Sequence, residues 1–274
     1  MLRLLMASLT LRKFFVLTLT ALLCGCAGIS RTNWVPSPNF NERRPNFVII
    51  HQTDSISHAR ALNTLTDPAR GVSAHYLIAK NGNITQLVEE KDRAWHAGKS
   101  WWGGQTDINS ASIGIELDNQ GELPFESAQI EALLTLLQGI SERYRIPVAN
   151  YLAHGDVAPG RKVDPNYTFP WKTLAERGFG IWCSTEESAS PTIVIDPSLG
   201  LQALGYDINN HDSAARAFRR HFRGDDSSAE LADEDLRVLS CLLKKKTQAN
   251  GSKTDAENGS PYIAAPSTAN GIRQ

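Results

Sequence analysis

Short apolar runs, spaced by polar segments, recur through the first two thirds of the chain. Five of them have the length and composition of strands: residues 47–50 (Phe-Val-Ile-Ile), 75–78 (His-Tyr-Leu-Ile), 84–88 (Ile-Thr-Gln-Leu-Val), 112–117 (Ser-Ile-Gly-Ile-Glu-Leu) and 151–153 (Tyr-Leu-Ala). Asn81-Gly82 lies between the second and third runs and is a strong signal for a tight turn. The pattern therefore predicts a sheet with a hairpin.

One longer segment has the periodicity of a helix. Its apolar residues recur at intervals of three and four positions and form a single stripe: Ile130, Leu133, Leu134, Leu137 and Ile140. Such a stripe predicts a helix that packs on a core. Strands interleaved with helices predict an α/β or α+β domain over residues 46–182.

The pattern changes after residue 182. Residues 183–191 are polar and are predicted to form a linker, and no strand pattern follows them. Spaced leucine, alanine and phenylalanine residues predict three short helices within a small domain over residues 192–246. We expect residues 247–274 to be a disordered tail, because they contain too few large apolar side chains to offset the entropy of ordering.

The start of the chain has the layout of an export signal. Residues 1–13 contain three cations and no acid, and the apolar run 14–23 is shorter than the roughly 20 residues that span a bilayer. Residues 23–26 (Leu-Cys-Gly-Cys) resemble the lipobox of bacterial lipoproteins. We therefore expect residues 1–25 to be a lipoprotein signal peptide and Cys26 to be the lipidation site.

The segment after Cys26 is predicted to be a tether to a membrane. Residues 26–45 are polar and irregular and contain three prolines. Ala27, and not aspartate, follows the expected lipidated cysteine. The resemblance to lipoproteins of bacteria with two membranes implies a location at the periplasmic face of the outer membrane.

The charge balance argues against nucleic acid as a partner. The chain has 28 Lys and Arg against 29 Asp and Glu, a net charge of −1. Loss of residues 1–25 removes three of the 28 cations and no anion, which leaves 25 against 29, or −4. A chain without a basic excess cannot neutralise a run of phosphates.

Two of the four cysteines remain once the signal peptide and the lipid are accounted for. Cys183 and Cys241 can pair in an oxidising compartment, or stay as buried free thiols. The sequence leaves both possibilities open, because a disulfide requires Cα atoms that lie about 4.4–6.8 Å apart.

Three residues have the types and positions expected of a metal site. His51 and His154 each follow directly on a predicted strand, and Asp164 lies ten residues after His154 in a loop stiffened by prolines and a glycine. Two imidazoles and a carboxylate suit Zn²⁺, and three protein ligands leave a fourth position open for water. An open position is typical of a catalytic zinc site.

Two further residues accompany this set. Glu116 lies on the predicted strand 112–117, and Lys162 lies two residues before Asp164. A carboxylate near a zinc site can accept a proton from water and return it to a leaving amine. A lysine can stabilise the oxyanion that forms when a carbonyl is attacked. The combination predicts amide hydrolysis.

Residues 46–182 resemble the zinc-dependent N-acetylmuramoyl-L-alanine amidases of the type 2 amidase family. Five segments match in order: residues 48–51 (Val-Ile-Ile-His), 72–78 (Val-Ser-Ala-His-Tyr-Leu-Ile), 94–101 (Ala-Trp-His-Ala-Gly-Lys-Ser-Trp), 112–117 and 153–165 (Ala-His-Gly-Asp-Val-Ala-Pro-Gly-Arg-Lys-Val-Asp-Pro). The resemblance implies an α/β fold with a mixed β-sheet flanked by helices, followed by the small helical domain.

The same resemblance implies roles for individual residues. It assigns the zinc ligands to His51, His154 and Asp164, the general base to Glu116 and the stabiliser of the transition state to Lys162. Two positions depart from the family pattern. Gln52 follows the first ligand in place of Tyr or His. Asn166 replaces the usual Gly after Asp-Pro, and it is expected to adopt the left-handed backbone conformation that Gly would have.

Four residues are candidates for substrate contacts. His96 and Trp95 belong to a segment that lines the family's cleft, Trp101 offers an apolar face, and Arg161 has the fork geometry that binds a carboxylate. His221 matches no ligand position and is expected at the surface. Residues 201–206 and 214–222 resemble three-helix peptidoglycan-binding-like domains.

The expected activity is hydrolysis of the bond between N-acetylmuramic acid, or its 1,6-anhydro form, and the L-alanine of the peptidoglycan stem peptide, in cell-wall turnover. Peptidoglycan and its muropeptide fragments are then the partners, with the membrane bound through the lipid anchor. Two alternatives remain, of which the intact metal-site residues argue against the first and the second uses the same chemistry on another bond. One is a peptidoglycan receptor without catalysis, and the other is a zinc peptidase that cuts within the stem peptide.

Overall fold

The computed structural model describes residues 42–189 and 196–257. The expected signal peptide, Cys26 and residues 26–41 of the expected tether lie outside these ranges. No helix within them is both long enough and apolar enough to cross a membrane.

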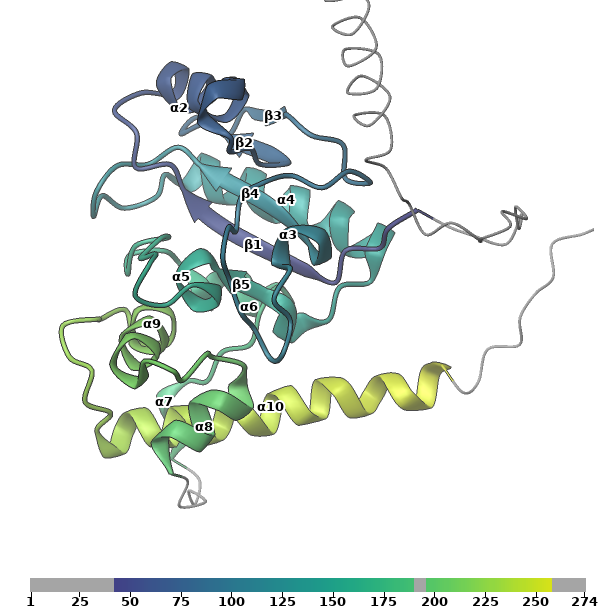
Figure 1. Cartoon of the computed structure of the whole chain (residues 1–274). Helices are drawn as coiled ribbons and strands as arrows, with labels where there is room; N and C mark the ends of the chain where they lie inside the picture. The colour runs from purple at the N-terminus through teal and green to yellow at the C-terminus, as the bar shows by residue number, and fades with distance from the viewer. Residues whose placement is uncertain (1–41, 190–195, 258–274) are drawn as a thin grey trace, which may run out of the picture. The chain divides into compact units, whose positions relative to one another are not determined.

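A five-stranded mixed sheet forms the centre of the fold (Figure 1). Its strands are β1 (Phe47–Gln52), β2 (Tyr76–Ile78), β3 (Ile84–Gln86), β4 (Ser112–Leu117) and β5 (Tyr151–Ala153). Their order is β3-β2-β4-β1-β5, and only the hairpin pair β2 and β3 is antiparallel. The prediction of a mixed sheet flanked by helices is confirmed.

The two faces of the sheet bury different side chains because successive residues of a strand point to opposite sides. Val48 and Ile50 of β1 belong to one apolar cluster with the stripe of helix α4 (Ser127–Tyr144). Phe47 and Ile49 belong to a second cluster, which includes residues from the C-terminal helices. The sheet is therefore covered on both faces, as expected for parallel strands.

The remaining helices connect and cover the strands. They are α2 (His58–Thr66), α3 (Ile108–Ala111), α5 (His154–Val157), α6 (Trp171–Glu176), α7 (Thr185–Ser188), α8 (Pro197–Leu204), α9 (His211–Arg223) and α10 (Asp233–Glu257), with short 3₁₀ turns at Pro68–Arg70 and Val148–Asn150. Side chains cap several of them; Ser57 and Asn210 each accept a hydrogen bond from the first turn of the helix that follows.

The three predicted C-terminal helices are present as α8, α9 and α10, and we call them the C-terminal module. The module does not have a separate core. Leu201, Tyr206 and Phe218 pack in the same cluster as Phe47 and Ile49 of β1. The module is therefore built onto the sheet, and its predicted binding to peptidoglycan stays a prediction.

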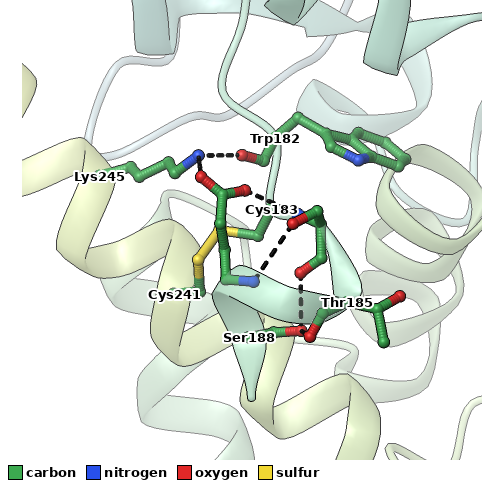
Figure 2. Close-up of a disulfide and its surroundings, with 8 residues drawn as sticks. Trp182, Cys183, Thr185, Ser188, Cys241 and Lys245 are labelled. Carbon is green, nitrogen blue, oxygen red and sulfur yellow. Dashed lines mark hydrogen bonds and ion pairs between the residues drawn. A yellow bond between two sulfur atoms is a disulfide. The ribbon is translucent and has the colours of Figure 1, made fainter. Parts of the chain in front are cut away.

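The expected linker at residues 183–191 is wrong for its described part. Residues 185–188 form helix α7, and Cys183 is bonded to Cys241 of α10, with Cα atoms 6.3 Å apart (Figure 2). Lys245 of α10 donates to the carbonyl of Trp182 and to the Glu187 carboxylate. These tertiary contacts order a segment whose composition alone indicates a linker.

The expected boundaries of the tether and the tail also differ from the structure. Arg43 donates to the carbonyls of Lys91, Ser110 and Ser112, so residues 42–46 are fixed to the domain. Helix α10 continues past Thr247 to Glu257. Extending a packed helix costs far less than starting one, so its polar residues continue the helix without a core of their own. Residues 258–274 lie outside the described ranges.

Removal of the disulfide should destabilise the whole described fold. The bond closes a loop of 58 residues, for which chain entropy predicts about 4 kcal/mol, and measured values are commonly about 2–4 kcal/mol. A Cys183→Ala/Cys241→Ala variant should lose that much free energy of unfolding in urea titrations, and reductant should lower the unmodified chain to the same level. Equal stability of the variant and the oxidised chain would contradict the prediction.

Candidate active site

His51 and Glu116 lie side by side on the central strands. The register pairs His51 of β1 with Glu116 of β4. Both side chains point away from α4, because they alternate with Ile50 and Ile115, which pack on that helix. β1 ends at Gln52, so the strand continues past the predicted apolar run 47–50 and includes His51 as its fifth residue.

His154 and Asp164 come from the segment that follows β5. His154 is the first residue of α5, and the chain then folds back so that the amide of Gly155 donates to the Asp164 carbonyl at 2.8 Å. This bond closes the loop between the two residues. His154 is buried and Asp164 is partly buried.

The structure brings the three predicted metal ligands together. His51 Nδ1 lies 2.9 Å from His154 Nδ1 and 3.4 Å from Asp164 Oδ2, and His154 Nδ1 lies 3.2 Å from the same carboxylate oxygen. Ligand atoms about 2.0–2.1 Å from a tetrahedral zinc ion are separated by about 3.3 Å. The spacing of these atoms fits Zn²⁺.

In His51 and His154, Nε2 points away from the metal site and donates a hydrogen bond. The Nδ1 atom that faces the site therefore keeps its lone pair. His154 Nε2 donates to the Ala97 carbonyl, so in a neutral ring Nδ1 is the nitrogen without a proton. The hydroxyl of Ser112 donates to the Ile108 carbonyl at 2.6 Å and accepts from His96 Nε2. His96 Nδ1 then accepts from His51 Nε2 at 3.0 Å.

This chain of bonds leaves His51 Nδ1 unprotonated as well. Burial, with a smaller contribution from His154, lowers the pKa of His51 to about 4, and burial lowers the pKa of His96 well below its usual range. Three electron-rich atoms with no hydrogen between them repel one another unless a cation lies among them. The donor set therefore fits a divalent metal in both spacing and protonation.

Gly114 makes room for the His96 ring. It lies on β4 between Ser112 and Glu116, and a methyl group at this position would lie 2.3 Å from His96 Cγ. The Gly114 amide also donates to Nδ1 of His75, which is buried and immediately precedes β2. The glycine in the Ser-Ile-Gly-Ile-Glu segment is thus required by the chain of bonds that orients His51.

Glu116 has the properties of a proton acceptor facing the site. Its Oε2 is buried and has no hydrogen-bond partner among the residues that the structure describes. Burial, and secondly the charge of Asp164, raise the pKa of Glu116 to about 8, while Lys162 acts in the opposite direction. A carboxylate with a raised pKa binds a proton more strongly than an exposed one, which suits a group that takes a proton from water.

These residues open into a cavity of about 490 Å³. Its lining includes the metal-site residues with Glu116 and Lys162, and also residues of α2 and of the segment after it. Arg60 and Arg70 are among these lining residues. The sequence analysis did not identify Arg60 as a site residue, because it follows no predicted strand. A second hollow of about 390 Å³ shares Lys162 and Asp164 with the first and reaches the C-terminal module.

The four candidate substrate contacts have different surroundings. Trp95, with 54% of its surface exposed, lines the cavity, as does His96. Trp101 is absent from the lining of both hollows. Arg161 lines the second hollow, but its guanidinium donates to the carbonyls of Ala97 and Lys99 and so holds that loop.

Two expectations about other residues are wrong. Asn166 does not have a positive φ; among the described residues other than Gly, only Asp54 and Arg145 do. Its side chain instead donates to the carbonyls of Gly121 and Leu123, and its amide donates to Gln52. His221 is not at the surface, since only 4% of it is exposed.

The cluster of imidazoles and carboxylates in an open cavity is typical of a metallohydrolase, and the comparisons with known proteins agree. A family model described as N-acetylmuramoyl-L-alanine amidase matches residues 41–167. The chain is 36% identical over 278 residues to the N-acetylmuramoyl-L-alanine amidase AmiD of Escherichia coli. The match covers 87% of this chain and 100% of the relative.

Solved structures show the same relationship. A complex of Escherichia coli AmiD with anhydro-N-acetylmuramic acid-L-Ala-D-γ-Glu-L-Lys superposes with a TM-score of 0.67 and covers 80% of this chain and 94% of that one. AmpDh3 of Pseudomonas aeruginosa with anhydromuramic pentapeptide is 30% identical, with a TM-score of 0.67 over 81% and 99% of the two chains. The chain belongs to the N-acetylmuramoyl-L-alanine amidase family.

Because its pKa is raised, Glu116 should lower the free energy of unfolding of the metal-free protein as the pH rises. Above its ordinary pKa of 4.5 the unfolded chain loses this proton, whereas the folded chain keeps it up to about pH 8. Stability therefore falls over this interval, because the unfolded state binds fewer protons than the folded state. A Glu116→Gln variant, which resembles the protonated acid, should gain stability relative to the unmodified chain as the pH increases from 4.5 to 8.

Urea unfolding with a chelator at both ends of this range measures the difference. Glu131→Gln, at an exposed position on α4, is the matched control and should show no such growth. A stability difference for Glu116→Gln that stays constant or shrinks as the pH rises would refute the prediction.

Proposed function

We propose that the chain uses zinc to hydrolyse the amide bond between N-acetylmuramic acid, or its anhydro form, and the L-alanine of the stem peptide. The observation that carries this proposal is the triangle of His51, His154 and Asp164 donor atoms beside the unpartnered Glu116 oxygen. Zinc bound there would lower the pKa of a water molecule and polarise the scissile carbonyl.

The residues of the chain supply the proton transfers and the charge stabilisation. Zinc in the site would lower the pKa of Glu116, so that the ionised carboxylate would accept the proton of the attacking water and pass it to the leaving amine of L-alanine. Lys162 lines the same cavity and provides positive charge for the oxyanion that forms at the carbonyl. The relay from Ile108 through Ser112 and His96 keeps His51 in the tautomer that the site needs.

The substrate class rests on the relatives. AmiD of Escherichia coli and AmpDh3 of Pseudomonas aeruginosa have both been captured with anhydromuramyl peptides. We infer that this chain takes muropeptide fragments of the same class, released during cell-wall turnover. The polar cavity with Arg60 and Arg70 on its wall suits a peptide that carries carboxylates.

We further propose that the protein acts at the periplasmic face of the outer membrane, anchored by a lipid on Cys26. The support is the order of charged, apolar and small residues at the start of the chain, together with Ala27 after Cys26. A disulfide between Cys183 and Cys241 is consistent with an oxidising compartment.

Mass spectrometry of muropeptides incubated with the zinc-loaded protein tests the reaction. The proposal predicts free stem peptides that begin with L-alanine, together with peptide-free sugar, and a chelator should abolish both. Binding to intact cell walls without cleavage would indicate a receptor instead. Shortened stems still attached to the sugar would indicate a peptidase.

Two variants separate the chemistry from metal binding in the same assay. Glu116→Gln should reduce turnover by at least about a hundredfold while zinc stays bound, since general base catalysis contributes about 10²–10⁴-fold. Asp164→Ala should lose zinc, which metal analysis of the purified protein measures directly. Normal turnover by the zinc-loaded Glu116→Gln variant would remove Glu116 from the mechanism.

The lipid anchor predicts a simple change in location. A Cys26→Ser variant should leave the membrane fraction and should no longer incorporate labelled fatty acid. A Cys241→Ser variant is the control, and it should stay in the membrane fraction and incorporate the fatty acid normally. Fatty-acid labelling of Cys26→Ser equal to that of the unmodified chain would contradict the assignment.

A further inference from the structure

Asp156 is a buried carboxylate next to the metal site. It lies two residues after His154 in α5, and only 1% of it is exposed. Its Oδ2 accepts a hydrogen bond of 2.8 Å from the amide of Ala153, the residue before His154. Asp156 therefore holds the bend at which the chain leaves β5 and presents His154.

The other partners of Asp156 come from the C-terminal module. The Tyr206 hydroxyl donates to Oδ1 at 2.7 Å, and His221 Nδ1 donates to Oδ2 at 2.6 Å. Burial and the Asp156 carboxylate raise the pKa of Tyr206 well above its usual range, so the hydroxyl stays protonated and donates. A buried carboxylate needs such donors, because its charge is otherwise unsatisfied.

Packing fixes the two donors in place. The His221 ring stacks on Trp171 with centroids 3.8 Å apart and on Phe222 with centroids 3.9 Å apart. The Tyr206 ring is fully buried and packs edge-on against Trp102 at 4.9 Å. Neither donor can move without displacing these neighbours, so the position of Asp156 is set by the module.

Helix α9 also lies beside α5, at the start of the loop that carries the ligands (Figure 1). A methyl group at Gly155 would lie 3.2 Å from Arg220 Nη1, and one at Gly160 would lie 2.6 Å from Ser213 Oγ. Ser213 lies near the start of α9 and Arg220 near its end, so both parts of this helix lie close to the loop. Gly155 and Gly160 are thus two positions at which a side chain on the loop would meet α9.

We propose that the C-terminal module is a positioning element for the metal site, which acts through Tyr206 and His221 on Asp156 and thereby on His154. The inference rests on the proposed function, since it takes His154 as a metal ligand. A displaced His154 would no longer keep its donor atom at bonding distance from a metal shared with His51 and Asp164. Groups that orient metal ligands typically change metal affinity or activity by 10–100-fold.

The test measures zinc affinity of the full chain by competition with a chromophoric chelator, for the variants Tyr206→Phe, His221→Phe and His221→Asn. Tyr206→Phe and His221→Phe keep the rings and remove the donors, and each should weaken zinc binding about tenfold or more. His221→Asn places an amide donor at the same distance from the backbone as Nδ1 and should restore most of the affinity.

The electronic spectrum of the cobalt-loaded variants is a second readout, because it reports the arrangement of the ligands and not overall stability. It should shift for the two variants that remove a donor and return toward the original in His221→Asn. Asp235→Asn is the matched control: Asp235 is an equally buried carboxylate that pairs with Arg219 and Arg223 inside the module. It should lower the melting temperature and leave zinc affinity and the cobalt spectrum unchanged.

Three results would overturn the inference. One is normal zinc affinity and an unchanged cobalt spectrum in both donor-removing variants, whatever their melting temperatures. Another is an equal loss of affinity in Asp235→Asn, which would make the effect one of general stability. The third is a His221→Asn variant no better than His221→Phe. Absence of zinc binding by the unmodified chain would instead contradict the proposed function, so the two failures are distinguishable.

Discussion

Three electron-rich atoms held within 3.4 Å of one another are the constraint on which the site depends. Left to themselves, two imidazole nitrogens and a carboxylate oxygen with no hydrogen between them would separate. The fold holds them in place from outside. The Ala97 carbonyl fixes His154, a relay that ends at the Ile108 carbonyl fixes His51, and the Gly155 amide closes the loop onto the Asp164 carbonyl. The protein is therefore organised around a position that a cation stabilises.

The sheet explains why distant residues meet there. Parallel strands β1, β4 and β5 end at the same edge, so His51, Glu116 and His154 come together although about a hundred residues separate the first from the last. Alternation along β4 then places Ser112, Gly114 and Glu116 on the face that carries His51. The polar residues of an otherwise apolar strand are the ones that build the site.

These features are local enough to be predicted from the sequence. The apolar runs predict the five strands. The ends of two of these strands indicate His51 and His154, and the stiffened loop after His154 indicates Asp164. The errors concern residues whose state depends on distant partners. Cys183 and Lys245 order a segment with the composition of a linker. His221 is buried because its ring stacks on Trp171 and Phe222 and its Nδ1 donates to Asp156. Arg161 holds a loop because backbone carbonyls lie within its reach, which no local pattern indicates. Arg60 reaches the cavity only through the placement of α2.

The C-terminal helices share one core with the sheet and contact the loop that carries two of the metal-site residues. Catalytic and C-terminal parts thus form one structural unit around the metal position. The most direct test of this account is zinc K-edge X-ray absorption of the zinc-loaded protein. We predict one zinc ion per chain with nitrogen and oxygen ligands at about 2.0–2.2 Å, imidazole scattering from two histidines and no sulfur. Zinc bound through sulfur, or with no imidazole, would contradict it.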